Sequence, residues 1–294
     1  MMIISMKKNA VIFYIKIVTL MIIGVLINNT KVCGNDSELE DLVICEDSIN
    51  YYFSLLVKET IDENKIKYND QILYYFNEAL KKSESFSYSF SSLKNVGIIT
   101  SDDNKLRIIT WNLPYSDRTH KYFGFIQYKD SKKSYNFYTL NDKSENIKNA
   151  EYAILNNKNW YGALYYKIIV NKSKGNTYYT LLGADLNTLL TKKKIIEIFF
   201  INNDGLPVFG AKVFKNKKTP ITRVIFEFNA QTSMTLTFDQ EKEIIIYDHL
   251  SPSRPSLEGQ FEFYGTDFSY DGLKFERGIW NFYEDIDVRD YNID

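Results

Sequence analysis

The chain has 294 residues, of which 45% are hydrophobic and 25% are charged. This composition excludes a largely disordered chain and a polytopic membrane protein. The 36 lysines and arginines nearly balance 37 aspartates and glutamates, so no overall charge attracts nucleic acid or an anionic membrane surface. We therefore expect an ordinary globular core, in one large or two medium domains, and no nucleic-acid partner.

Residues 1–34 have the layout of a secretory signal peptide. Two lysines, Lys7 and Lys8, precede an apolar run from Val11 to Ile27, and polar residues follow this run. Cleavage after Gly34 is the favoured interpretation. An uncleaved anchor is the alternative, because the apolar run approaches the roughly 17–25 residues that span a bilayer. The sequence thus predicts export to the periplasm or cell surface, with the membrane contacted only through this segment.

Residues 35–85 are predicted to form a helical element that packs on the rest of the chain. Apolar residues recur at spacings of three and four over 49–57 and again over 72–80, which is typical of a helix with one buried face. The polar stretch 62–70 is expected to connect the two helices. The candidate N-cap residues are Asp47 or Ser48 for the first helix and Asn69 or Asp70 for the second.

Residues 86–294 are predicted to form one continuous antiparallel β domain. The hydrophobic period changes from 3.6 to 2 at about Phe86, and clear alternation follows, as at 106–111 and 223–228. Short polar clusters separate the apolar runs, and strands joined by such short turns are antiparallel. The expected fold is therefore mainly β (α+β), with about a dozen strands in a sandwich or curved meander, and a propeller is less favoured because the turns are unevenly spaced. The predicted turns lie at 101–104, 129–133, 171–175, 202–205, 215–218, 239–242 and 270–272.

The stretch 159–185 is rich in aromatic residues and supports two interpretations. On a solvated sheet face its aromatic side chains could stack on sugar rings or on another protein. Alternatively, these residues are simply good strand formers in a chain that contains 23 tyrosines and 20 phenylalanines. The second interpretation is favoured. The candidate binding residues under the first are Trp160, Tyr161, Tyr165 and Tyr178.

The stretch 244–256, "IIIYDHLSPSRPS", contains one of only two histidines in the chain. Its first three residues are predicted to be a buried strand, followed by a loop that leads to a strand at 261–264. Histidine is the simplest acid–base group at neutral pH, so the loop and His120 are the places to look for catalysis. A structural loop histidine is favoured, because no nucleophile motif is present. The catalytic candidates under the alternative are His249, Ser251, Ser253 and Arg254.

No metal site and no cofactor is predicted. The only cysteines, Cys33 and Cys45, cannot build a zinc site. The acidic stretches 101–104 and 283–294 lack the spacing of a calcium loop, and the sequence has no phosphate-binding or dinucleotide glycine motif. The first stretch is expected to be a hairpin turn and the second a solvated tail.

Several segments resemble a family of uncharacterised exported proteins of Bacteroidota. The resemblance extends over about residues 95–289 and is carried by "KKIIEIFFINNDGLPVFGAKVF", "RVIFEFNAQTSMTLTFD" and, most specifically, "IIIYDHLSPSRPSLEGQFEFYGTDFSYDGLKFERGIWNF". It implies a bacterial protein of the periplasm or cell surface. It implies no catalytic residues, substrate or cofactor.

The sequence therefore leads to two functional hypotheses. The favoured one is a non-catalytic binding or structural module of the bacterial envelope, whose partner is another envelope protein, a glycan or the cell wall. The alternative is an envelope hydrolase with its site in the loop 247–256. The first is preferred because the sequence shows a signal-like segment and antiparallel strands but no convincing set of catalytic residues.

Overall fold

The structure is a computed structural model that describes residues 37–130, 135–215 and 219–290. The predicted signal segment 1–34 lies outside these residues. In the part of the chain that is described, no helix is both long enough and apolar enough to cross a membrane.

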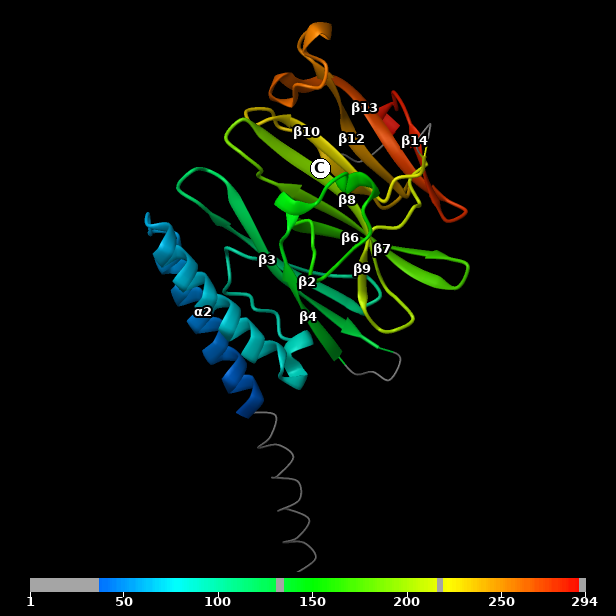
Figure 1. Cartoon of the computed structure of the whole chain (residues 1–294). Helices are drawn as coiled ribbons and strands as arrows, with labels where there is room; N and C mark the ends of the chain where they lie inside the picture. The colour runs from blue at the N-terminus through cyan, green and yellow to red at the C-terminus, as the bar shows by residue number, and fades with distance from the viewer. Residues whose placement is uncertain (1–36, 131–134, 216–218, 291–294) are drawn as a thin grey trace, which may run out of the picture.

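The described residues form three antiparallel sheets and two long helices (Figure 1). The mainly β (α+β) fold predicted from the sequence is therefore confirmed. The first sheet contains β1 (Gly97–Thr100), β2 (Leu106–Pro114), β3 (His120–Lys129) and β4 (Tyr135–Asn141), in that order. The second contains β5 (Leu155–Asn156), β6 (Leu164–Ser173), β7 (Asn176–Asp185), β8 (Thr191–Ile201), β9 (Pro207–Phe209) and β10 (Arg223–Asn229). The third contains β11 (Leu236–Asp239), β12 (Ile244–Pro252), β13 (Tyr264–Glu276) and β14 (Ile279–Tyr283).

The second sheet is the centre of the molecule. Its strands follow the order β5-β9-β8-β7-β6, and β10 pairs with the part of β8 that β9 leaves uncovered. In the first and third sheets every strand pairs with its neighbour in sequence, as in a meander. The described residues also form short 3-10 helices. Those between longer elements are η1 (Ser83–Phe86), η2 (Ser144–Asn146), η3 (Ala150–Tyr152), η4 (Pro255–Leu257) and η5 (Phe261–Phe263), and η6 (Val288–Asp290) follows β14.

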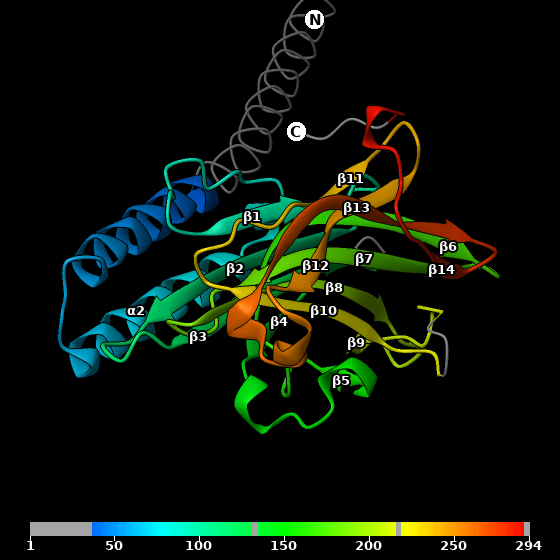
Figure 2. The same cartoon turned by 90° about the horizontal axis from the view of Figure 1, so that it is seen from above.

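Among the described residues, three hydrophobic cores lie between the helices and the sheets. Alternate residues of β2 enter different cores: Trp111 packs under the helices, whereas Ile108 packs against the second sheet. In the same way, Ile195 of β8 faces the first sheet and Ile196 faces the third. The resulting order is helices, first sheet, second sheet, third sheet, from lower left to upper right in Figure 1. Seen from above, the third sheet lies in front of the other two, with β5 at one side (Figure 2).

The helices begin earlier than the sequence pattern indicated. The first covers residues 37–56 in the described part of the chain, so the candidate caps Asp47 and Ser48 lie within it. The second, α2, is Asp62–Leu80, and the stretch 62–70 expected to be a connection is its first half. Two polar residues of this half, Lys65 and Asn69, are buried through specific bonds to β2, which a hydrophobic pattern cannot reveal. Lys65 donates to the carbonyl of Pro114 at 3.0 Å, and Asn69 accepts the indole N–H of Trp111 at 2.8 Å.

Most predicted turns connect successive strands of the sheets. The clusters at 101–104, 171–175, 202–205 and 239–242 each join two antiparallel strands, as expected. Those at 129–133 and 215–218 fall partly outside the described residues. The turn predicted at 270–272 is wrong, because these residues lie inside β13. The chain reverses instead at Arg277 and Gly278, both of which have positive φ.

Candidate functional site

The strand β12 is longer than the sequence indicated. Ile244, Ile245 and Ile246 are buried, as predicted, but the strand continues to Pro252 and so includes His249. Its pairing with β13 shifts between Asp248 and Leu250, which is a bulge of the kind that redirects a side chain. The strand predicted at 261–264 is wrong: η5 occupies Phe261–Phe263, and β13 begins only at Tyr264.

His249 pairs with a carboxylate of the neighbouring strand. Its Nδ1 lies 2.8 Å from Oδ2 of Asp271, whose other oxygen accepts the backbone N–H of Asp285. The hydrogen bond to Asp271 raises the pKa of His249 above its usual value. The imidazole side chain is 45% exposed. Asp271 itself also ties the chain after β14 to the third sheet, through its bond from Asp285.

The other catalytic candidates of this loop lie apart from the imidazole. Ser251 and Ser253 line a shallow cavity of about 360 Å³, together with Glu262, and neither His249 nor Arg254 is among its lining residues. Arg254 is exposed and immediately precedes η4. The structure thus does not bring the four residues of the hydrolase hypothesis into one cavity.

The aromatic residues of 159–185 belong mainly to the core. Trp160 is fully buried, and its indole donates to the hydroxyl of Tyr165, which is itself buried and bonded to Glu197. Tyr161 is also buried. Tyr178 is half-buried and packs on the core between the second and third sheets, where its ring contacts that of Phe200. These side chains pack between sheets and do not share an exposed face, which agrees with the interpretation that they are strand and core residues.

Two adjoining cavities lie where the hairpin between β2 and β3 meets the second sheet. The first, which we call the larger cavity, has a volume of about 950 Å³ and is bounded by the connection between the helices, the hairpin and β6. The second, which we call the polar cavity, has a volume of about 520 Å³ and extends to β7 and β8. Tyr115 and His120 line both. Both volumes fall in the range of small-molecule sites.

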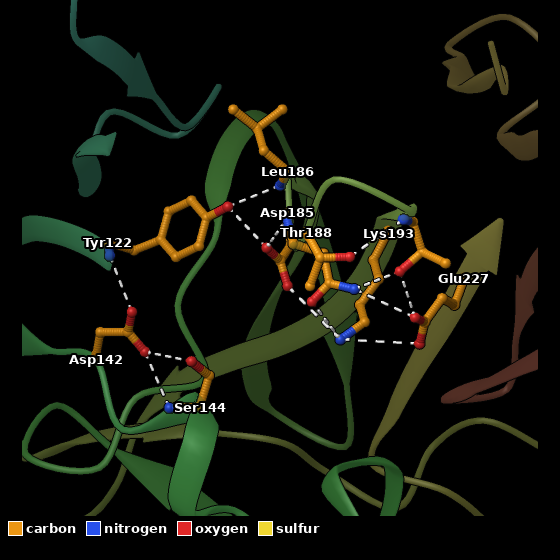
Figure 3. A network of polar contacts seen from close by, with 10 residues as sticks. Tyr122, Asp142, Ser144, Asp185, Leu186, Thr188, Lys193 and Glu227 are labelled. Atoms are coloured by element: carbon orange, nitrogen blue, oxygen red, sulfur yellow. Dashed lines mark hydrogen bonds and ion pairs between the residues drawn. The ribbon is translucent and has the colours of Figure 1, made fainter. Parts of the chain in front are cut away.

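Asp142 lies in one wall of the polar cavity, just after β4 (Figure 3). Its Oδ2 accepts the backbone N–H of Tyr122 at 2.9 Å, and its Oδ1 accepts the N–H and the hydroxyl of Ser144 at 2.9 and 2.7 Å. Burial raises the pKa of this carboxyl, and the bonds from Ser144 and Tyr122 oppose that rise. The carboxylate is therefore fixed in position by its own chain.

Asp185 and Lys193 form the opposite wall, at the facing ends of β7 and β8. Asp185 accepts the hydroxyl of Tyr122 and the backbone N–H of Asn187, both at 2.7 Å. The Nζ of Lys193 lies 3.9 Å from Asp185, 3.8 Å from Glu227 and 3.1 Å from the side-chain oxygen of Asn187. Figure 3 shows the lysine between the two carboxylates. This network joins residues of four strands, β3, β7, β8 and β10, and of the loop that follows β7.

His120 lies between the two cavities at the start of β3. The side-chain N–H of Asn112 donates to its Nδ1 at 2.8 Å, so Nδ1 is an acceptor and the proton of the neutral ring is on Nε2. Burial lowers the pKa of His120, although Asp185 and Asp117 act in the opposite direction. At neutral pH the ring is therefore an uncharged hydrogen-bond donor and acceptor on the shared wall.

Of these residues, sequence reasoning had singled out only His120. Asp142 and Asp185 are single charged residues at strand ends, and Lys193 is one of three consecutive lysines near the start of β8. Their meeting depends on the strand pairing. Among the described residues, no group of three or more histidine, cysteine, aspartate or glutamate side chains is arranged to hold a metal ion.

Comparisons with protein-family models, with curated proteins and with solved structures give no match to this chain. Its function is therefore inferred from its own residues.

Proposed function

We propose that the protein is an exported bacterial envelope protein that binds a ligand, without transforming it, in the polar cavity and the larger cavity beside it. The observation that carries this proposal is the polar cavity itself, where Asp142, Asp185 and Lys193 are held in place by hydrogen bonds and ion pairs before any ligand arrives. Groups fixed in advance lose little freedom on binding, and this raises affinity.

The same bonds favour binding over catalysis. Each oxygen of Asp142 already accepts at least one hydrogen bond from the chain, and Asp185 is bonded to Tyr122 and Asn187 while it faces Lys193. A general base needs an oxygen directed at the substrate proton. Carboxylates engaged in this way shape a cavity and set its charge.

Export rests on the sequence of residues 1–34 and on the resemblance to exported proteins of Bacteroidota. Its test is fractionation of cells that express the complete chain. Recovery of a shortened chain in the periplasm or at the cell surface is the expected result, and recovery of the full-length chain in the cytoplasm would contradict it.

Binding is tested with a panel of three probe classes: cell-wall muropeptides, neutral oligosaccharides and short peptides, each titrated into the purified protein by calorimetry. Lys193→Gln should change the affinity for whichever class binds, because this residue lines the polar cavity. Its control is Lys192→Gln, because successive residues of β8 point to opposite faces of the sheet. Equal effects of the two substitutions, or no binding by any of the three classes, would contradict the proposal.

A hydrolase site on the loop 247–256 is the second candidate, and one observation favours it. A histidine oriented by a carboxylate, as His249 is by Asp271, corresponds to two of the three members of a catalytic triad. Its test is hydrolysis of a p-nitrophenyl ester by the wild type, His249→Ala and Ser251→Ala proteins. An activity that both substitutions abolish would support this candidate, and equal rates in all three proteins would eliminate it.

A further inference from the structure

The larger cavity carries an excess of positive charge. Its lining includes Lys65, Lys94 and Arg118 but only one acidic residue, Glu59. Glu59 is engaged with the start of α2, where it accepts the backbone N–H groups of Thr60 and Ile61 at 2.8 and 2.9 Å. The single negative charge of this cavity is thus directed at the protein backbone.

The exposed cations of the larger cavity are Lys94 and Arg118. Lys65 is buried and paired with Asp62 at 3.1 Å, so its charge is compensated. Lys94 and Arg118 are both exposed, and within the described residues neither is paired with a carboxylate. A ligand in this cavity therefore meets two uncompensated positive charges at its rim.

The polar cavity has the opposite character. Four carboxylates line it, against two lysines, and one of these, Lys193, is shared between Asp185 and Glu227. Glu145 is exposed at the edge of this cavity. The neutral ring of His120 lies on the wall shared with the larger cavity, so the two regions of opposite charge are adjacent.

We infer that the ligand is a short peptide with free ends, bound with its amino end in the polar cavity and its carboxyl end in the larger cavity. This inference rests on the proposed function and names its ligand class. An unmodified peptide carries one positive and one negative charge at its two ends, and this matches the division between the cavities. A neutral oligosaccharide gains from neither charge excess, and an anionic one gains from only one.

The test compares one peptide sequence with its capped forms. Alanine-based tripeptides, tetrapeptides and hexapeptides are titrated with both ends free, with the amino end acetylated, and with the carboxyl end amidated, since these caps remove the terminal charges. Each cap should weaken binding about twofold to tenfold, as expected for partly exposed ion pairs. Equal affinity of free and capped peptides would overturn the inference.

Substitutions then assign each end to a cavity. Arg118→Gln should weaken binding of peptides with a free carboxylate but leave the amidated peptides unchanged. Glu145→Gln should weaken binding of peptides with a free amino group but leave the acetylated peptides unchanged. Lys158→Gln and Glu241→Gln are matched controls, because both residues are exposed and neither lines the two cavities. The reverse assignment of ends, or equal effects on free and capped peptides, would contradict the inference.

The panel of probe classes separates this inference from the proposed function. Binding of free-ended peptides that each cap weakens and that Lys193→Gln alters supports both. Binding of neutral oligosaccharides but of no peptide would overturn the peptide inference while leaving the binding function intact. Binding by no probe class would overturn both.

Discussion

Glu197 and Arg223 form an ion pair that has no exposure to solvent. The Nε of Arg223 lies 2.5 Å from Oε1 of Glu197, and the hydroxyl of Tyr165 donates to Oε2 of the same carboxylate. The guanidinium also donates to the carbonyl of Ala150 and lies over the ring of Tyr161, 5.3 Å from its centre. One buried pair thus ties β8 and β10 to η3, to Tyr161 and to Tyr165 of β6.

Removing one partner of this pair should be more harmful than removing both. Arg223→Met leaves the charge of Glu197 buried without its cation, so we expect a loss of about 3–5 kcal/mol in the free energy of unfolding. The double substitution Arg223→Met, Glu197→Leu removes both charges and should recover much of that loss. Urea unfolding measures all three proteins, and a double variant less stable than the single one would contradict this account.

The sequence predicted a mainly β, antiparallel fold preceded by helices but not the helical half at 62–70. Alternation and turn residues are local signals, and they located most strands together with the turn at 202–205. The first half of α2 has no such signal, because Lys65 and Asn69 are polar and are buried only through bonds to a strand about 40 residues or more away. A periodic pattern of hydrophobic residues does not show hydrogen bonds between residues so far apart in the sequence.

Asn69 should stabilise the protein through Trp111. The indole N–H of Trp111 donates to Oδ1 of Asn69 at 2.8 Å, and both residues are buried. Asn69→Leu leaves that N–H without a partner, so we expect a loss of about 1–3 kcal/mol in the free energy of unfolding. Asp70→Leu is the control, since Asp70 is the next residue of the helix and is exposed. Urea unfolding with tryptophan fluorescence reports both, and equal losses would argue against the bond.

The candidate site was less predictable than the fold, for a related reason. Three charged residues that meet in the polar cavity, Asp142, Asp185 and Lys193, are separated by up to 51 positions in the printed sequence, and each looks like an ordinary surface charge. Strand pairing brings them together. By contrast, the conspicuous residue His249 stands apart from the serines that follow it. A rare residue type marks where to look, but only the fold shows what surrounds it.

The stability contributed by His249 should decrease as the pH rises. Its hydrogen bond to Asp271 raises its folded-state pKa above the ordinary value of 6.5, so its contribution is complete below that value. The contribution is lost as the pH rises through the raised folded-state pKa. His249→Gln should flatten this decrease in urea midpoints measured at a series of pH values. An unchanged pH dependence would contradict the assigned pairing.

The stability contributed by His120 should instead decrease as the pH falls. Burial lowers its folded-state pKa, so the stability that comes from keeping the ring neutral is present above pH 6.5 and is lost as the pH falls through the lowered value. His120→Gln should remove this loss at acidic pH. Because the chain has only two histidines, each variant also assigns one imidazole signal in an NMR titration. A titration midpoint above 6.5 for His120 would contradict the burial argument.

Gly162 should be essential for the position of Asp142. It has a φ of +80°, and a Cβ atom there would lie 2.7–2.9 Å from the carboxyl group of Asp142. Gly175 has the same φ with nothing near its Cβ position, so Gly175→Ala should cost only the backbone strain of about 1–2 kcal/mol. Gly162→Ala should cost more and should shift the amide NMR signals of Tyr122 and Ser144, whose N–H groups donate to Asp142. If both variants lose equal stability and these two signals stay in place, the contact does not position the carboxylate.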